Sequence, residues 1–94
     1  MTVSEYPIPS GSIPLDITVG PDGNLWFTEA GSNKIGTMSP NGTLIAEYAI
    51  PTAGSSPWQI IAGPDGNLWF TESAGNKVAK ITTSGTITEY DAGN

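Results

Sequence analysis

One ten-residue segment occurs twice in this 94-residue chain and restricts the folds that the chain can adopt. Gly20–Glu29 reads Gly-Pro-Asp-Gly-Asn-Leu-Trp-Phe-Thr-Glu, and Gly63–Glu72 repeats it letter for letter at an offset of 43 residues. An identity of this length in so short a chain indicates an internal duplication. Each copy should therefore be one supersecondary unit that packs against the next.

Each copy of the repeat is predicted to be a set of short strands joined by tight turns. Pro21–Asn24 predicts a turn in which Pro fixes the first φ and Gly takes a positive φ, and Asn41–Gly42 predicts a hairpin turn. No helical period is present, so the fold class is all-β. Apolar, β-branched and aromatic residues gather in eight segments, at residues 16–19, 25–28, 34–38, 43–48, 59–62, 68–71, 77–81 and 86–90.

The length of the repeat identifies the architecture. A unit of 42–43 residues that holds four short antiparallel strands is typical of a β-propeller blade. We therefore expect two four-stranded blades, at residues 7–48 and 49–90, with an extra outer strand at 1–6 and a tail at 91–94.

The outermost strand of the blade occurs once more often than the inner strands. Its sequence is present at Thr2–Tyr6, Leu44–Tyr48 and Thr86–Tyr90, whereas the three inner strands occur only twice. If copies of the chain join in a ring, the last blade can take its outer strand from its own C-terminus or from the N-terminus of a neighbour. Both strands cannot occupy the same edge.

Two blades alone do not close a propeller. Each blade buries its faces against the blades on either side, so an isolated pair leaves two apolar faces exposed. Propellers close with roughly four to eight blades. We therefore predict a cyclic homo-oligomer with head-to-tail contacts, either a trimer of six blades or a tetramer of eight.

Charge and composition exclude several classes of partner and chemistry. The net charge is −6, the only cations are Lys34, Lys77 and Lys80, and there is neither Arg nor His. Nucleic acid and anionic membrane surfaces are therefore not expected as partners. There is no Cys for thiolate chemistry, no apolar run of about 20 residues for a membrane span, and no signal-peptide pattern after Met1. The cell compartment stays open.

The repeated motif, followed by Asn33–Gly36 and by Gly85–Tyr90, resembles the streptogramin B lyase (virginiamycin B lyase) family over nearly the whole chain. The resemblance implies a segment of a seven-bladed propeller that would hold about two blades. It also implies a magnesium-dependent elimination that opens a cyclic depsipeptide lactone.

The resemblance carries over to the site residues only in part. The metal-binding Glu of the family corresponds to Glu29 and Glu72, which implies magnesium as a possible cofactor. The family's catalytic His, which follows a Pro, corresponds to Leu15 and Trp58. Elimination needs a base to remove a proton, and neither Leu nor Trp can act as one. We therefore expect no enzymatic activity and no cofactor from this chain by itself.

Three residues are candidates for ligand binding. Glu29 and Glu72 could converge near the channel of a ring and bind a divalent cation, or each could end its strand with a turn hydrogen bond or face solvent. Trp58 could stack on a sugar or ring ligand at the channel mouth, or pack in the connector. A further set of residues is expected to be structural or remote from any shared cleft: core Trp26 and Trp69, turn residues Asp22 and Asp65, and outer-strand residues Glu5, Glu47 and Glu89.

Three functions follow from the sequence, in order of preference. The first is a self-assembling propeller scaffold, excised or engineered from a lyase-like protein. The second is a module that binds a sugar or another small molecule at repeated loops around the ring. The third is a magnesium-dependent lyase, which ranks last because the chain has no His.

Overall fold

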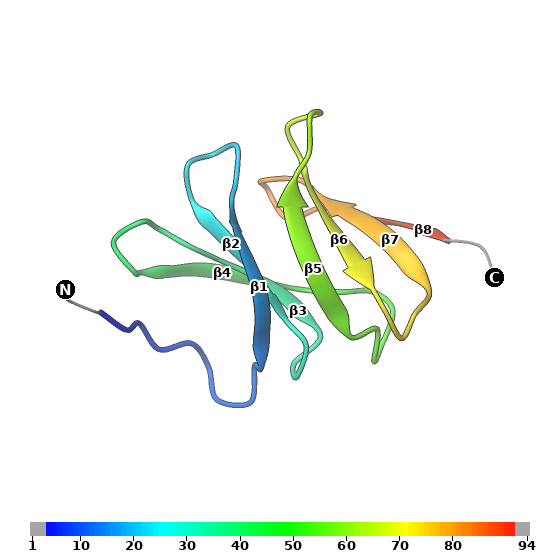
Figure 1. Ribbon diagram of the computed structural model, residues 1–94, viewed down its shortest axis with the longest axis horizontal. Coiled ribbons are helices and arrows are strands. Elements are labelled where there is room, and N and C mark those ends of the chain that lie inside the picture. The colour runs from blue at the N-terminus through cyan, green and yellow to red at the C-terminus, as the bar shows by residue number, and fades with distance from the viewer. Residues whose placement is uncertain (1–3, 92–94) are drawn as a thin grey trace.

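The computed structural model describes residues 4–91, which form eight strands and no helix (Figure 1). The strands are β1 Pro14–Val19, β2 Leu25–Glu29, β3 Lys34–Met38, β4 Leu44–Ala49, β5 Pro57–Ala62, β6 Leu68–Glu72, β7 Lys77–Ile81 and β8 Ile87–Asp91. Within this part of the chain no helix is long and apolar enough to cross a bilayer.

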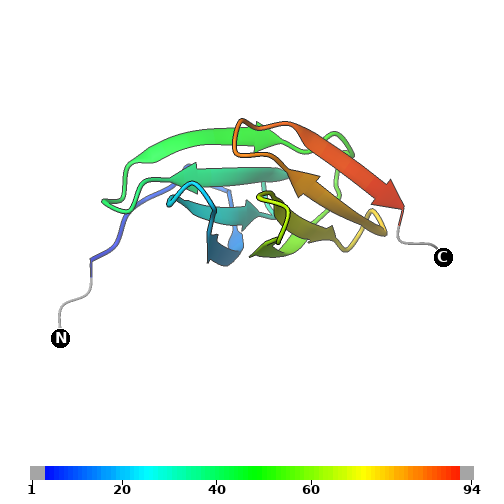
Figure 2. The same cartoon turned by 90° about the horizontal axis from the view of Figure 1, so that it is seen from above.

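The strands form two separate four-stranded sheets. Each sheet is an antiparallel meander in chain order, β1-β2-β3-β4 in the first and β5-β6-β7-β8 in the second. Figure 2 shows β1 and β5 along one edge of this pair of sheets and β4 and β8 along the opposite edge. The predicted all-β class with two four-stranded blades is confirmed, and we call the sheets blade 1 and blade 2.

The two blades share an irregularity at their inner edge. The pairing of β1 with β2 shifts register between Pro14 and Ile17, and the pairing of β5 with β6 shifts at the equivalent Pro57 and Ile60. A bulge is expected near a Pro at the start of a strand, because Pro has no N–H to donate to the ladder. Blade 1 has a second shift, between Thr37 and Met38, where the extra residue of β4 lies.

The predicted Pro-Asp-Gly-Asn turns are present, and each Asp also accepts a hydrogen bond from a tryptophan side chain. Asp22 accepts hydrogen bonds from the backbone N–H of Asn24 at 3.1 Å and from the indole N–H of Trp26 at 3.0 Å. Burial raises the pKa of Asp22, but these hydrogen bonds outweigh it and hold the pKa below its ordinary value. Asp65 and Trp69 repeat the contact at 3.0 Å, so the structural role predicted for both aspartates is confirmed.

The hairpin turn at Asn41–Gly42 differs in detail from the prediction. Gly42 has a φ of +89°, but Asn41 is not among the described residues with a positive φ. The Gly42 N–H donates to the carbonyl of Ser39 at 2.9 Å, so the glycine alone provides the left-handed residue that closes the turn.

The two blades lie side by side (Figure 1), and buried side chains of both form one core cluster. The junction is also hydrogen-bonded, because the Ile60 N–H donates to the Asp16 carboxylate at 2.9 Å and the Thr28 hydroxyl donates to the Trp58 carbonyl at 3.2 Å. The buried cluster takes Trp26 and Ile35 from blade 1, Ile50 from the connector, and Ile60, Leu68, Phe70, Ala79 and Ile81 from blade 2.

Asn33 holds the connector between the blades in place. Its side-chain N–H donates to the Thr52 carbonyl at 2.8 Å, and its oxygen accepts from the Ser55 N–H at 3.1 Å and hydroxyl at 2.7 Å. The Ile50 N–H donates to the Asn33 carbonyl at 3.0 Å. One residue therefore ties the exit from β4 to the entry into β5.

The ends of the chain depart from the sequence expectation. The extra outer strand was expected at residues 1–6, of which Met1–Val3 lie outside the described residues and residues 4–6 belong to no strand. No blade precedes blade 1 in the described residues, so this segment has no sheet edge on which to pair. Of the tail expected at 91–94, Asp91 is the last residue of β8, and residues 92–94 lie outside the described part.

Candidate functional site

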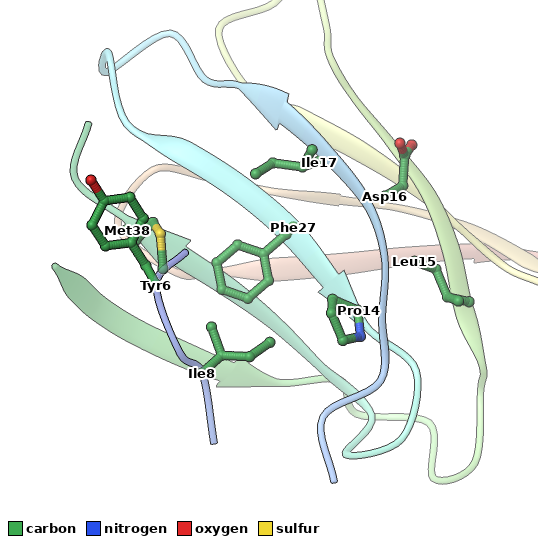
Figure 3. Close-up of a pocket in the computed structure, with 8 residues that line it drawn as sticks. All are labelled: Tyr6, Ile8, Pro14, Leu15, Asp16, Ile17, Phe27 and Met38. Carbon is green, nitrogen blue, oxygen red and sulfur yellow. The ribbon is translucent and has the colours of Figure 1, made fainter. Parts of the chain in front are cut away.

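The outward face of blade 1 contains an apolar groove of about 360 Å³. Figure 3 shows the Phe27 ring in the middle of the groove, with Tyr6 and Ile8 from the N-terminal segment on one side and Ile17 on the other. The lining is completed by Pro14, Leu15, Asp16 and Met38.

The same repeat positions are covered in blade 2. The counterparts of the groove residues Ile8, Ile17, Phe27 and Met38 are Ile50, Ile60, Phe70 and Ile81, and all four belong to the core between the blades. Ile17 is 57% exposed, whereas Ile60 is 2% exposed. The groove is therefore a blade-packing face that lacks its blade.

The outward face of blade 2 carries the repeat counterparts of the residues that blade 1 uses at the junction. It carries a shallower hollow of about 170 Å³, in which Ile61 is 62% exposed. Its residues Gln59, Trp69, Thr71 and Val78 are the repeat counterparts of Asp16, Trp26, Thr28 and Ile35. Those four blade 1 residues make the hydrogen bonds and apolar contacts of the junction between the blades.

The two candidate glutamates end β2 and β6 and are both buried. Glu29 is 0% exposed and Glu72 is 1% exposed, so neither faces solvent. The Ser32 hydroxyl donates to one oxygen of Glu29 at 2.9 Å. The other oxygen lies over Gly36, where a side chain of any size would collide with it. This oxygen of Glu29 and both oxygens of Glu72 receive no hydrogen bond from a donor group among the described residues.

A second carboxyl group lies beside each buried glutamate. Glu47 on β4 is opposite Gly36 and interacts with Glu29, and Glu89 on β8 is opposite Ala79 and interacts with Glu72. Two carboxylates in contact repel each other unless a proton lies between them. One proton shared within each pair would remove this repulsion and join one oxygen of each carboxyl group in a hydrogen bond.

The pKa shifts follow this arrangement. Burial, followed by the contact with Glu89, raises the pKa of Glu72 from an ordinary value of 4.5 to about 7. Burial and Glu47 raise the pKa of Glu29 in the same way. Burial also raises the pKa of Glu89, but hydrogen bonds with Glu72 and Thr52 outweigh it and leave the pKa below its ordinary value.

The sequence placed Glu47 and Glu89 far from any shared cleft, and it did not reveal that each lies beside a buried glutamate. Antiparallel pairing of β3 with β4 and of β7 with β8 brings the outer-strand glutamate over a small residue, Gly36 or Ala79. That small residue leaves room for the carboxyl group that ends the second strand. The available signal was the small residue at the centre of each third strand.

The fit to a magnesium ion is poor for each pair of glutamates taken alone. Mg²⁺ prefers six oxygen ligands in an octahedron and keeps several waters. Here each site offers only two carboxyl groups, of which Glu29 or Glu72 is buried, and the described residues contain no cluster of three or more acidic, His or Cys side chains that could hold a metal ion.

Trp58 differs from the other two tryptophans. It is 54% exposed on β5, more than either of the others. Its backbone carbonyl accepts the hydrogen bond from Thr28 across the junction. Trp26 is fully buried, as predicted for a core residue, whereas Trp69 on the outward face is only partly buried.

Comparison with known proteins places this geometry in a family. The model of the virginiamycin B lyase family matches residues 1–94. No curated protein sequence matches the chain. Virginiamycin B lyase from Staphylococcus aureus is 47% identical over 96% of this chain, with a TM-score of 0.91, and a streptogramin B lyase structure is 48% identical over 99%, with a TM-score of 0.94.

The chain covers only 31% of the length of each of these two lyase chains. Hydrazine synthase from Kuenenia stuttgartiensis shares the fold alone, with a TM-score of 0.75 at 18% identity over 100% of this chain and 27% of that one. The repeat, the two blades and the family match agree, and the chain belongs to the virginiamycin B lyase family.

Proposed function

We propose that this chain is an assembly unit of a β-propeller, whose two outward faces pack head-to-tail on copies of itself to close a ring. The observation that supports the proposal is the relation between the faces. The outward face of blade 1 has the residue types that blade 2 uses at the junction, and the outward face of blade 2 has those that blade 1 uses there.

Energetics favours covering these faces. Burying one exposed Val, Leu or Ile side chain stabilises a protein by about 1.5–3 kcal/mol. Ile17 on one face and Ile61 on the other are each more than half exposed, and Val78 adds to the second face. A head-to-tail contact is heterologous, so it either closes into a ring or extends indefinitely. The twist between successive propeller blades favours closure, as a trimer of six blades or a tetramer of eight.

Light scattering on a gel-filtration peak tests the proposal. The expected mass is three or four times the 9.7 kDa of one chain. Ile17→Glu places a charge in the groove without disturbing the core and should give the mass of one chain. Thr83→Glu changes an exposed turn residue and should keep the assembled mass. A folded monomer for the unchanged chain would overturn the proposal.

A second candidate function is ligand binding at Trp58, favoured by the exposure of this aromatic side chain. A ring would repeat Trp58 around its axis and make weak binding multivalent. Tryptophan fluorescence in a screen of sugars and of Mg²⁺ tests both this site and the proposed metal role of Glu29 and Glu72. A fluorescence change that persists in Trp58→Phe, or no fluorescence change at all, would count against Trp58. A fluorescence response to Mg²⁺ that persists in the double variant Glu29→Gln with Glu72→Gln would count against the glutamates.

Lyase activity is the third candidate. Glu72 has a pKa raised to about 7, which suits a base at neutral pH, but its side chain is closed to solvent and to any substrate. The positions of the family's catalytic His hold Leu15 and Trp58. Turnover of a streptogramin B substrate with Mg²⁺, abolished by Glu72→Gln, would establish this candidate against our expectation.

A further inference from the structure

Tyr6 in the N-terminal segment occupies a position that, in blade 2, is filled by a tyrosine from the outer strand of blade 1. The Tyr6 ring lies against Gly42, in the turn between β3 and β4, and leaves no space there for a side chain. The Tyr48 ring lies against Gly85, in the turn between β7 and β8, in the same way. Tyr48 belongs to the outer strand of the preceding blade, so Tyr6 takes the position of an outer-strand tyrosine from a blade that precedes blade 1.

We propose that Ser4–Ile8 of one copy forms the outermost strand of blade 2 in a neighbouring copy, in place of that neighbour's β8. This inference rests on the head-to-tail assembly proposed above and specifies how its contact is made. The partner is a second copy of this chain, and the surface that receives the strand is the edge of β7 that β8 leaves.

Steric competition makes the two candidate strands alternatives. Tyr6, Tyr48 and Tyr90 stand at the same position of the repeat. If β8 stayed in place in a head-to-tail contact, Tyr90 would reach the Gly42 turn of the next copy, as Tyr48 reaches the Gly85 turn. Tyr6 of that next copy already occupies the Gly42 turn. One of the two tyrosines must therefore leave.

Chain continuity favours the N-terminal segment. At the junction within the chain, β4 completes blade 1 and runs directly into blade 2 through Ile50, which is buried. The exit from β4 has the sequence Tyr48-Ala49-Ile50-Pro51. The N-terminal segment has the equivalent sequence Tyr6-Pro7-Ile8-Pro9 and runs directly into blade 1. The C-terminal copy reads Tyr90-Asp91-Ala92 and lacks the isoleucine.

The contacts of β8 can be replaced almost one for one. Tyr90 stacks on Trp69 with ring centroids 5.9 Å apart, and the Lys80 ammonium lies over both rings. Tyr6 would take over this stack, and Glu5 would take the place of Glu89 beside Glu72. The pair of Lys77 with Asp91 at 3.4 Å would be lost, but Asp91 is 87% exposed, and such a pair contributes little.

Cysteine cross-linking distinguishes the two arrangements, because the chain has no Cys of its own. Thr88 lies opposite Lys80 in the ladder, and Ser4 stands at the position of Thr88 in the repeat. Cross-strand partners lie within the Cα separation that a disulfide spans. Ser4→Cys with Lys80→Cys should therefore form disulfides between chains, visible as a covalent ladder on a non-reducing gel.

The matched control is Thr88→Cys with Lys80→Cys, which should close within one chain. That disulfide fixes β8 on β7, so the oxidised protein should lose its assembled mass and regain it on reduction. The strand exchange would be overturned, and the assembly left intact, by two results together. The Ser4→Cys, Lys80→Cys protein would assemble without forming a covalent ladder, and the Thr88→Cys, Lys80→Cys protein would keep its assembled mass when oxidised. A monomeric unchanged chain would overturn both.

A second pair of variants avoids Lys80. Tyr6→Ala removes the ring that the exchange places on Trp69 and should reduce the mass to that of one chain. Tyr90→Ala removes a ring that the exchange displaces and should leave the assembled mass unchanged. The reverse outcome, with Tyr90→Ala monomeric and Tyr6→Ala assembled, would show that β8 is the strand in the contact.

Discussion

The two faces of blade 1 and the two faces of blade 2 repeat the same side chains but differ in what covers them. Trp26 and Ile35 are fully buried at the junction, whereas their counterparts on the outward face of blade 2, Trp69 and Val78, are only partly covered. The difference teaches that the burial of these side chains depends on the presence of the next blade. The apolar residues at these positions are the same or similar in both blades.

The largest expected contrast is between the two repeated tryptophans. At dilutions where the chain is monomeric, Trp26→Ala should reduce the free energy of unfolding by about 3–5 kcal/mol, because it leaves a cavity in the junction. Trp69→Ala should cost about 1–2 kcal/mol, since it loses mainly the stack with Tyr90. Urea unfolding followed by circular dichroism measures both, and equal losses would break the comparison. A Trp26→Ala chain that does not fold at all would agree with it.

The isoleucines of the inner strands give the next contrast. Ile60→Ala at the junction should cost about 2–4 kcal/mol, and Ile17→Ala in the open groove should change the stability of the monomer by no more than about 0.5 kcal/mol. In an assembled protein the Ile17 substitution should instead weaken association. A loss for Ile17→Ala at high dilution as large as that for Ile60→Ala would mean that the groove is already covered within one chain.

A smaller effect should follow from the junction hydrogen bond. Asp16→Ala leaves the Ile60 N–H without its acceptor inside the interface and should cost about 1–3 kcal/mol. Gln59→Ala, at the same repeat position on the outward face of blade 2, should be nearly neutral in the monomer. Hydrogen exchange of the Ile60 amide provides a direct measurement: it should accelerate in the Asp16 variant and stay unchanged in the Gln59 variant.

The smallest expected effect concerns the carboxyl pairs, which both blades share. Folding raises the pKa of Glu72 to about 7, so the folded state binds this proton more tightly than the unfolded state. The corresponding stability is fully present below about pH 4.5, and it is lost as the pH rises to about 7. The lowered pKa of Glu89 acts in the opposite sense and removes stability as the pH falls through the acidic range.

Glu72→Gln should flatten the decline in stability between about pH 4.5 and 7, because the amide replaces the protonated form. Thr83→Gln changes an exposed turn residue and adds no ionisable group, so it serves as the control, with the same pH profile as the unchanged chain. Thermal unfolding across pH 4 to 8 provides the measurement. A decline in Glu72→Gln as steep as in the control would show that the Glu72–Glu89 pair does not titrate in this range.

The sequence predicted the strands, turns and blades well because each depends on contacts within one repeat. The eight expected segments correspond to β1–β8, and the duplicated Pro-Asp-Gly-Asn turn was correct in both copies. The sequence did not reveal that Asp22 binds the Trp26 indole, because the contact depends on the rotamer of a strand residue. Residues 4–6 have the outer-strand sequence but form no strand, since strand pairing needs a partner edge that the described chain lacks there.

Among the candidate sites, the sequence identified Glu29 and Glu72 but not their partners. Glu47 and Glu89 are distant in the sequence and approach only because the third and fourth strands pair over Gly36 and Ala79. The exposure of Trp58 was equally undecided, because a residue at the start of an inner strand can point into a connector or out of the sheet.

The sequence by itself determined the duplication, the four-stranded unit and the family, because these follow from local patterns that recur at a fixed spacing. Only the tertiary structure decided which side of each blade is covered, where the glutamates meet and where Tyr6 lies. Those features depend on distances between segments that the chain brings together by folding, and on the free energy of burying one blade face against another.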